Sequence, residues 1–152
     1  MFASLTRRTI VIGSAAYVGA AALPHTAAAT PDALAATLKS ILGEKLARAG
    51  RIKLDIPELA ENGNSVPLTI TVDSPMTAAD HVKTIYVLSP ENPLPDVARF
   101  HLGPRAGRAK VSTAVRLATS QRLMVLAVMA DGSAWTAGAD VIVTMSACID
   151  TG

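Results

Sequence analysis

The chain has 152 residues, and half of them are apolar while only 3% are aromatic, so its core must be built from Val, Ile, Leu and Ala. It carries 14 Lys and Arg against 12 Asp and Glu. Two of these cations, Arg7 and Arg8, lie in a predicted export signal, which leaves a near-neutral mature protein. This balance does not support nucleic-acid binding through bulk charge.

Residues 1–29 are predicted to be an export signal peptide. Arg7 and Arg8 supply its charged start, a stretch rich in Ala and Gly follows, and three alanines at 27–29 offer the small side chains of a cleavage site. The arginine pair resembles the twin-arginine motif, which exports folded proteins, and a Sec signal is the alternative. Both routes predict a bacterial periplasm, which is an oxidising compartment.

Residues 31–49 are expected to form one amphipathic helix. Thr30-Pro31-Asp32 has the composition of a helix start, with a capping hydroxyl, a proline in the first turn and an early acid. Apolar residues then recur at helical spacing: Leu34, Leu38, Ile41, Leu42 and Leu46. Gly50 is placed to end the helix.

Beyond Gly50 the apolar period changes from that of a helix to two, which is typical of half-buried strands. Seven short strands are predicted, at 52–56, 66–72, 82–88, 97–102, 109–118, 123–130 and 140–146. We expect 57–64 to be a turn-forming segment and 103–107 to be a hairpin turn. Short strands at this spacing predict a mainly β protein, an antiparallel β-sandwich with one helix at its N-terminal side.

The familiar catalytic and metal-binding patterns are absent from the sequence. His81 and His101 have no metal-ligating residue at motif spacing and are expected at a sheet edge or on the surface. Glu58 and Glu61 are expected to be solvated charges beside a turn. We therefore predict no metal, no cofactor and no catalytic residue, and we do not expect an independent enzyme.

Cys148 is the one cysteine of the chain, four positions before Gly152. It has no partner for an internal disulfide, although the predicted compartment is oxidising. An exposed thiol beyond the last strand is able to form a covalent adduct, since a free cysteine titrates near pH 8.5. The alternative is a buried cysteine that completes the core as a small hydrophobe.

Several segments together carry a resemblance to a known family. They are Gly50–Ile52, Ile56–Gly63 with Val66-Pro67, Asp73–Met76, Asn92-Pro93 with Val97–Phe100, Arg116–Gln121, and Ala130–Gly132. In this combination, residues 50–146 resemble the SoxY protein of the bacterial sulfur-oxidising (Sox) system. The chain then divides into a signal at 1–29, a helix at 30–49, a SoxY-like domain at 50–146 and a C-terminal arm at 147–152.

The resemblance implies an immunoglobulin-like sandwich that is exported by the twin-arginine route and pairs with a smaller subunit, SoxZ. It also implies that Cys148 is the covalent attachment site for sulfur. In that family a haem enzyme couples thiosulfate oxidatively to the thiol, and other Sox enzymes process the bound sulfur. The carrier has no turnover of its own.

The tail departs from the family pattern, in which glycines flank the cysteine as Gly-Gly-Cys-Gly-Gly. Here Ser146-Ala147 precede Cys148, and Ile149-Asp150-Thr151 follow it, so the arm is expected to be stiffer because glycine explores more backbone conformations. Two alternatives to the carrier therefore stay open. One is a diverged interaction module that pairs with a SoxZ-like subunit without loading thiosulfate, and the other is a binding module that forms an intermolecular disulfide.

Overall fold

A computed structural model describes residues 31–146 as one N-terminal helix followed by nine strands. In chain order the elements are α1 (Pro31–Leu42), β1 (Arg48–Ala49), β2 (Ile52–Asp55), β3 (Leu59–Asn62), β4 (Val66–Val72), β5 (Val82–Leu88), β6 (Asp96–His101), the single-turn 3₁₀ helix η1 (Pro104–Ala106), β7 (Lys110–Val115), β8 (Gln121–Met129) and β9 (Ala134–Met145).

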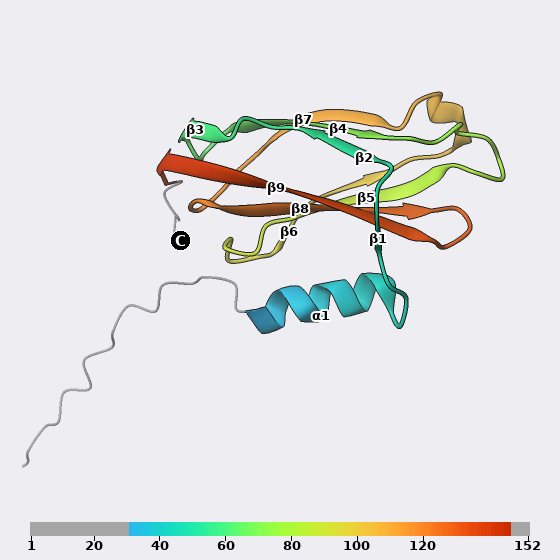
Figure 1. Ribbon diagram of the computed structural model, residues 1–152, viewed down its shortest axis with the longest axis horizontal. Helices are drawn as coiled ribbons and strands as arrows, with labels where there is room; N and C mark the ends of the chain where they lie inside the picture. The colour runs from blue at the N-terminus through green and yellow to red at the C-terminus, as the bar shows by residue number, and fades with distance from the viewer. Residues whose placement is uncertain (1–30, 147–152) are drawn as a thin grey trace, which may run out of the picture.

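The strands form two stacked sheets (Figure 1). The larger sheet has the order β1-β9-β8-β5-β6, with β3 also pairing with β9, and the smaller sheet has the order β2-β4-β7. This arrangement confirms the predicted immunoglobulin-like β-sandwich. Most neighbours are antiparallel, but β1 and β3 both pair with β9 in parallel, which the expectation of a purely antiparallel sandwich did not include.

The core between the sheets is aliphatic, as the composition predicts. In β4, Val66, Leu68, Ile70 and Val72 are buried and alternate with more exposed residues. The facing strands β5 and β8 contribute buried valines, one leucine and one isoleucine. Alternation puts every second side chain on one face of a strand, so the period of two identified in the sequence specifies which side of each strand enters the core.

The predicted helix at 31–49 is too long. Helix α1 ends at Leu42, and Gly43 follows with a φ of 61°, a left-handed conformation that glycine adopts without strain at helix ends. The sequence predicted Gly50 as the end of the helix. Gly50 has a φ of 116° and packs against Trp135 instead of ending the helix. Its α-carbon lies against the ring of Trp135, where an added β-carbon would be 3.5 Å from the nearest ring atom.

The stretch at 50–51 carries the chain from β1 in one sheet to β2 in the other. Arg51 also has a positive φ, 57°, which is uncommon for a residue with a side chain. It is held by its contacts: its carbonyl accepts from the Asp73 amide at 2.7 Å, and its guanidinium lies 5.0 Å from the centre of the Trp135 ring. A guanidinium over an indole face is a favourable cation–π pair.

Two loop predictions need correction. The segment 57–64 contains strand β3, with the sequence Leu-Ala-Glu-Asn. Only one of its four residues is buried, so the strand does not need the apolar alternation that would have revealed it in the sequence. The segment 103–107 is not a hairpin turn. It contains η1 and links β6 of the larger sheet to β7 of the smaller sheet. The seven predicted strands therefore become nine, and the last one begins at Ala134 rather than at residue 140.

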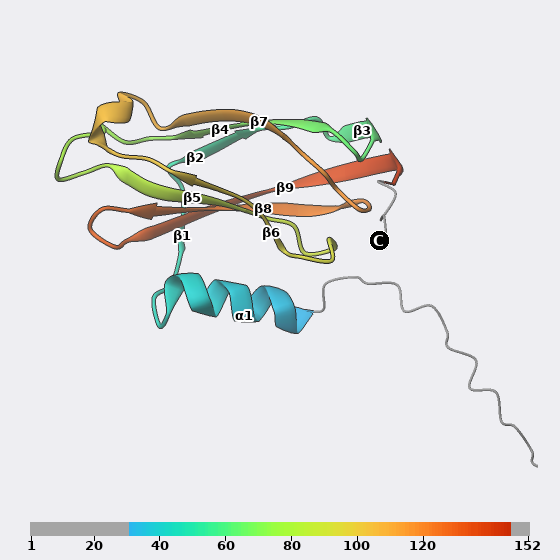
Figure 2. The ribbon, with the colours of Figure 1, turned by 180° about the vertical axis from the view of Figure 1, so that it is seen from behind.

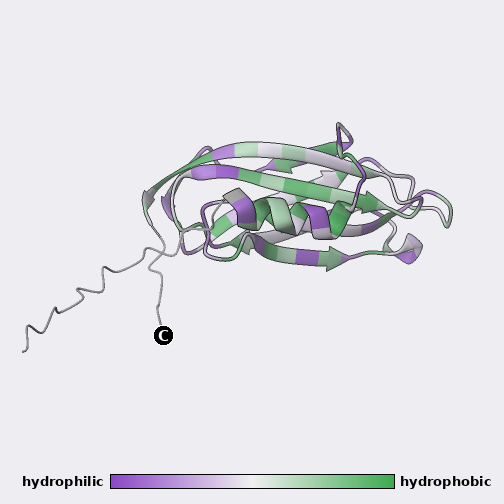
Figure 3. Cartoon of the chain, turned by 90° about the horizontal axis from the view of Figure 1, so that it is seen from below, coloured by the Kyte–Doolittle hydropathy of each residue, from purple (hydrophilic) through white to green (hydrophobic). Residues whose placement is uncertain are grey.

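Helix α1 lies along the outer face of the larger sheet (Figures 1 and 3). Leu126 on that face pairs in register with Tyr86 and Thr136, and it is fully buried although it lies outside the core cluster between the sheets. Leu88 shares this face and is equally buried. Leu34 and Leu38 of α1 belong to a half-buried stripe at helical spacing, which is the pattern of a helix with one side against protein. The helix therefore forms a third layer.

A tight turn connects β8 to β9 at the end of the sandwich near the helix C-terminus. The Asp131 carboxylate accepts hydrogen bonds from the Ser133 hydroxyl at 2.6 Å and from the Ser133 amide at 2.8 Å. These two bonds hold the pKa of Asp131 below its ordinary value. Lys45 donates to the Gly132 carbonyl at 3.0 Å, which joins the segment after α1 to this turn.

The burial of Leu126 on the outer face predicts the cost of shortening this side chain. We expect Leu126→Ala to lower the free energy of unfolding by about 2–5 kcal/mol, because a fully buried leucine is replaced by a cavity. Urea denaturation followed by circular dichroism measures this change. Leu94→Ala is the control, since Leu94 is 77% exposed and should change stability by less than about 0.5 kcal/mol. Equal effects of the two substitutions would contradict the burial described for Leu126.

Candidate functional site

The described chain leaves the sandwich at the end of β9. One edge of β9 pairs with β8, with Val141 opposite Gln121. Its other edge pairs in parallel with β3, where Leu59 lies beside Ile142 and Asn62 beside Met145. Figures 1 and 2 both show β3 next to this end of β9. β8 pairs with β9 up to Val141, and β3 pairs with it from Ile142 to Met145. The last strand therefore stays hydrogen-bonded to a neighbouring strand until Met145, which confirms the predicted end of the strand at Thr144 or Met145.

Further hydrogen bonds fix this exit point. The Gly63 amide donates to the Met145 carbonyl at 2.9 Å, and the Leu117 amide donates to the Gly63 carbonyl at 2.8 Å. The Thr144 hydroxyl donates to the Glu61 carbonyl at 3.0 Å. Two of these bonds join β9 to the segment 61–63, and the third joins Gly63 to Leu117. The backbone before Ser146 is therefore held by a segment that is itself anchored to another part of the chain. We call Thr144, Met145 and Ser146 the arm base.

A buried polar network supports the loops around the arm base. The Gln121 amide oxygen accepts from the Ser89 hydroxyl at 2.6 Å and from the Glu91 amide at 3.0 Å. The Gln121 amide nitrogen donates to the Asn92 side-chain oxygen at 3.2 Å. Because buried polar groups are costly without partners, this satisfied set fixes the loop after β5 against the start of β8.

Asn92 extends the network to a third segment. Its side chain donates to the Arg116 carbonyl at 2.7 Å and accepts from the Ala118 amide at 2.8 Å. Ser120 then bonds to β9 itself, since its hydroxyl accepts from the Val143 amide at 2.8 Å. In the sequence, the segments containing Asn92, Ser120 and Gln121 were evident only as markers of resemblance to a family. Their signal was a polar residue where a strand begins or ends, which by itself does not reveal a hydrogen-bond partner.

Exposed apolar side chains gather near the arm base. Of the five large hydrophobic residues exposed in the described chain, Leu59, Ile142 and Met145 belong to β3 or to the end of β9. Leu59 and Ile142 are register partners and so share one face. Beside them on the outer face, Arg122 and Asp140 form an ion pair at 2.6 Å. Single exposed hydrophobes are ordinary, but neighbouring ones are typical of contact surfaces.

The predicted attachment residue lies outside the described residues. Cys148 and the arm at 147–152 belong to the part that the structure does not describe, as do Arg7 and Arg8 of the predicted export signal. The exposure of the Cys148 thiol therefore stays a prediction. The structure describes the framework that precedes it, which ends two residues earlier at Ser146.

The histidines and carboxylates singled out in the sequence do not converge. His101 is exposed on the edge strand β6 beside Thr84, at 3.2 Å, and half-buried His81 bonds to the Thr77 carbonyl at 3.0 Å. Glu58 and Glu61 are exposed, as expected, although Glu61 lies in β3 rather than in a loop. Within 31–146, no group of three or more His, Cys, Asp or Glu is placed to hold a metal ion.

Among the elements between Pro31 and Ser146, no helix combines the length and apolar character needed to cross a bilayer.

A protein-family model matches most of this chain. The family model described as "Sulfur oxidation protein SoxY" matches residues 38–148. This chain belongs to the SoxY family. The match covers well over half of the sequence, including all nine strands and the arm base. The resemblance inferred from the sequence motifs is thereby confirmed. No curated protein sequence matches the chain significantly.

Solved structures support the same relationship. The sulfur carrier protein SoxY from Chlorobium limicola f thiosulfatophilum is 27% identical, with a TM-score of 0.62 over 76% of this chain and 100% of that one. A superoxide reductase (neelaredoxin) from Ignicoccus hospitalis has a TM-score of 0.53 at 21% identity, covering 77% of this chain and 95% of its own. At that identity the second likeness shows a shared sandwich fold.

The buried network predicts a stability effect at the arm base. We expect Gln121→Ala to lower the free energy of unfolding by about 1–3 kcal/mol, because the Ser89 hydroxyl and the Glu91 amide lose their acceptor in a buried place. Chemical denaturation measures the loss, and hydrogen exchange at the Glu91 amide should become faster. Ser112→Ala is the control, because it removes an exposed bond to Thr69. A loss no larger than in the control would contradict the role assigned to the network.

Proposed function

We propose that this protein is a periplasmic sulfur carrier that holds thiosulfate-derived intermediates covalently on Cys148 and presents them to sulfur-oxidising enzymes. The observation that carries the proposal is the extent of the family match, which runs through the sandwich and ends at residue 148, the cysteine itself. The similar SoxY structure from Chlorobium limicola is described as a sulfur carrier protein. The match thus includes the one thiol of the chain.

The arm base supports a carrier role through covalent geometry. Consecutive α-carbons are 3.8 Å apart, so the α-carbon of Cys148 is within about 7 Å of that of Ser146. Ser146 follows residues of β9 that pair with β3 on one edge, and the Ser120 hydroxyl contacts Val143 on the other. A cysteine this close to a fixed point stays attached to a rigid domain whatever conformation the arm takes, so a partner that recognises the domain finds the thiol nearby.

The chemistry needs a thiolate and an oxidant but no catalytic group on this chain. Coupling the Cys148 thiolate to thiosulfate forms one sulfur–sulfur bond and releases two electrons, which a haem enzyme of the Sox system accepts. Hydrolysis of the terminal sulfonate then adds one water and yields sulfate, two protons and a persulfide that stays on Cys148. We assign these steps to partner enzymes, and this protein is their substrate rather than a catalyst.

Partners and location follow from the same family membership. We assign a SoxZ-like subunit as the partner in a heterodimer, and we assign export by the twin-arginine route to the pair Arg7 and Arg8. The exposed apolar residues around the arm base, such as Leu59 and Ile142, fit a protein contact near the thiol.

The carrier role predicts a specific covalent product. Incubation with thiosulfate, a SoxZ-like partner and the haem enzyme should add the mass of one thiosulfate-derived group to the intact protein, and peptide mapping should place it on Cys148. Cys148→Ser should gain no mass, because the chain has one cysteine. A glycine-tailed SoxY treated in the same way is the positive control. If that control loads while this protein does not, the carrier proposal is wrong.

The tail sequence supports a second candidate, the diverged interaction module. Ile149 and Asp150 replace glycines of the family pattern, adding bulk and a negative charge beside the thiol. If they limit loading, glycines at 146–147 and 149–151 should raise the loading rate, since glycine restores backbone freedom. Intact mass spectrometry over a time course measures this rate. A chain that never loads, with or without glycines, yet still binds the SoxZ-like subunit would favour the interaction module.

A further inference from the structure

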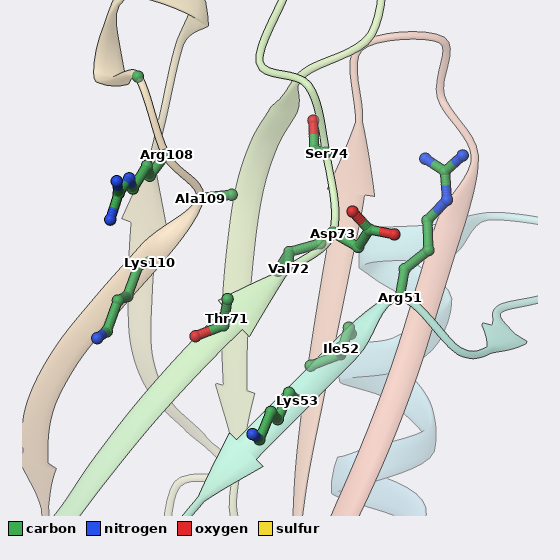
Figure 4. Close-up of a pocket in the computed structure, with 11 residues that line it drawn as sticks. Arg51, Ile52, Lys53, Thr71, Val72, Asp73, Ser74, Arg108, Ala109 and Lys110 are labelled. Atoms are coloured by element: carbon green, nitrogen blue, oxygen red, sulfur yellow. The ribbon is translucent and has the colours of Figure 1, made fainter.

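The outer face of the smaller sheet carries a basic groove, on the opposite side of the sandwich from α1. The groove has a volume of about 570 Å³ and lies over β2, β4 and β7 (Figure 4). Four of its lining residues are cations, Arg51, Lys53, Arg108 and Lys110, and one is an acid, Asp73. The mature chain is near neutral, so this is a local concentration of positive charge.

Strand register explains why the charges gather. Lys53 pairs with Thr71, and Thr71 pairs with Lys110, so the three residues form one row across the sheet. All three are exposed, which places them on the solvent side of their strands. Two strand spacings put the α-carbons of the lysines about 10 Å apart. We call Lys53, Arg108 and Lys110 the basic face.

The cations of the basic face form no ion pair. Ion pairs in the described chain occupy Arg51, Arg99 and Arg122, and none involves a residue of the basic face. Arg51 is engaged elsewhere, with Asp80 at 3.6 Å and with the Trp135 ring. Two exposed acids lie nearby, Asp73 in the groove and Asp55 in the next row of the sheet. The three cations outnumber these acids, so the face stays net positive.

The geometry favours a protein surface over a small anion as the ligand. Figure 4 shows the charged ends of Lys53, Arg108 and Lys110 directed to separate points over the face rather than toward one centre. All three side chains are exposed, so none is fixed by burial. A built site for one small anion needs convergent donors, whereas separated cations complement several carboxylates spread over a partner.

We infer that the basic face is a docking surface for a partner protein that presents a cluster of carboxylates. The inference goes beyond the proposed function, because it concerns recognition of the domain and not the cargo. The basic face is remote from the arm base. Strand β4 begins near the arm base at Val66, since Gly63 bonds to Met145, and it reaches the basic face at Thr71, the partner of Lys110. That run spans about 16 Å, so a docked partner leaves the arm base uncovered.

Such a surface mainly affects the rate at which a partner associates. Clustered exposed charges raise the rate of association with an oppositely charged partner, and salt weakens the effect because the Debye length is about 10 Å at 0.1 M. Docking on the basic face would therefore give weak, salt-sensitive binding, which suits a protein that several partners must reach and leave.

The test is a titration of the isotope-labelled full chain with an octaglutamate peptide, followed by the amide resonances of Lys53, Thr71 and Lys110. We expect these amides to shift at low salt and to respond much less at 0.3 M salt. Lys53→Glu combined with Lys110→Glu should weaken binding about tenfold or more. The matched control, Lys39→Glu with Lys83→Glu, makes the same change in net charge at two exposed lysines outside the groove and should bind like the parent.

Three results would overturn the inference. They are shifts that centre on another part of the surface, an equal loss in the control variant, and saturation of the same amides by inorganic sulfate or by phosphatidylglycerol vesicles at matched ionic strength. Lys53→Gln with Lys110→Gln keeps the test decisive if the glutamate variant fails to fold, because neutral side chains remove the attraction without repulsion. The titration needs no thiosulfate loading, so failure of the carrier proposal leaves its result unchanged.

Discussion

The pairing of β9 on both of its edges is the constraint on which the rest of the structure depends. β9 is the longest strand, and it is the one element that contacts β8, β1 and β3 by hydrogen bonding. Its antiparallel partner β8 sets the register of the larger sheet, and its parallel partner β3 fixes the last residues before Ser146. A domain whose final strand is held in this way can present its C-terminal segment from one defined point.

The buried network and the helix serve this constraint from different sides. Gln121 and Asn92 satisfy each other and the surrounding backbone in the loops at the arm end, so these loops cannot shift without leaving buried polar atoms unpaired. Helix α1 lies along the outer face of the larger sheet, the face on which Leu126 is fully buried, and its half-buried side adds to the apolar area removed from water. Two exposed surfaces then differ in chemistry: apolar side chains lie near the arm base, and cations lie on the basic face.

Much of the fold was predictable because it depends on local patterns. Strands β4 and β5 were predicted at 66–72 and 82–88, where the structure has them, since apolar alternation directly reports a half-buried strand. Strand β3 was missed because its backbone pairs with a segment about eighty residues later and its side chains are mostly exposed. The helix end was misplaced because two glycines, Gly43 and Gly50, both have left-handed backbones and the sequence does not say which one ends the helix.

The same distinction applies to the candidate site. The position of Cys148 near the chain end and the family motifs were evident from sequence, and the family is confirmed by the match that reaches this residue. The support for the arm base was not evident, because the partners of Met145 are backbone atoms of Gly63 and its neighbours, which have no side-chain signature. The row of Lys53 and Lys110 likewise depends on register across three strands, which spacing along the chain cannot supply.

The two short parallel strands also have a consequence for solubility. Within the described sheet, β1 covers the outer edge of β9 at Trp135 and Thr136, and β3 covers it from Ile142 to Met145. The stretch left between them, 137–141, is less than half of the twelve-residue strand. An open edge of this length is a poor template for strands of neighbouring molecules. Two fragments that contribute little to the core thus protect the longest strand from edge-to-edge aggregation.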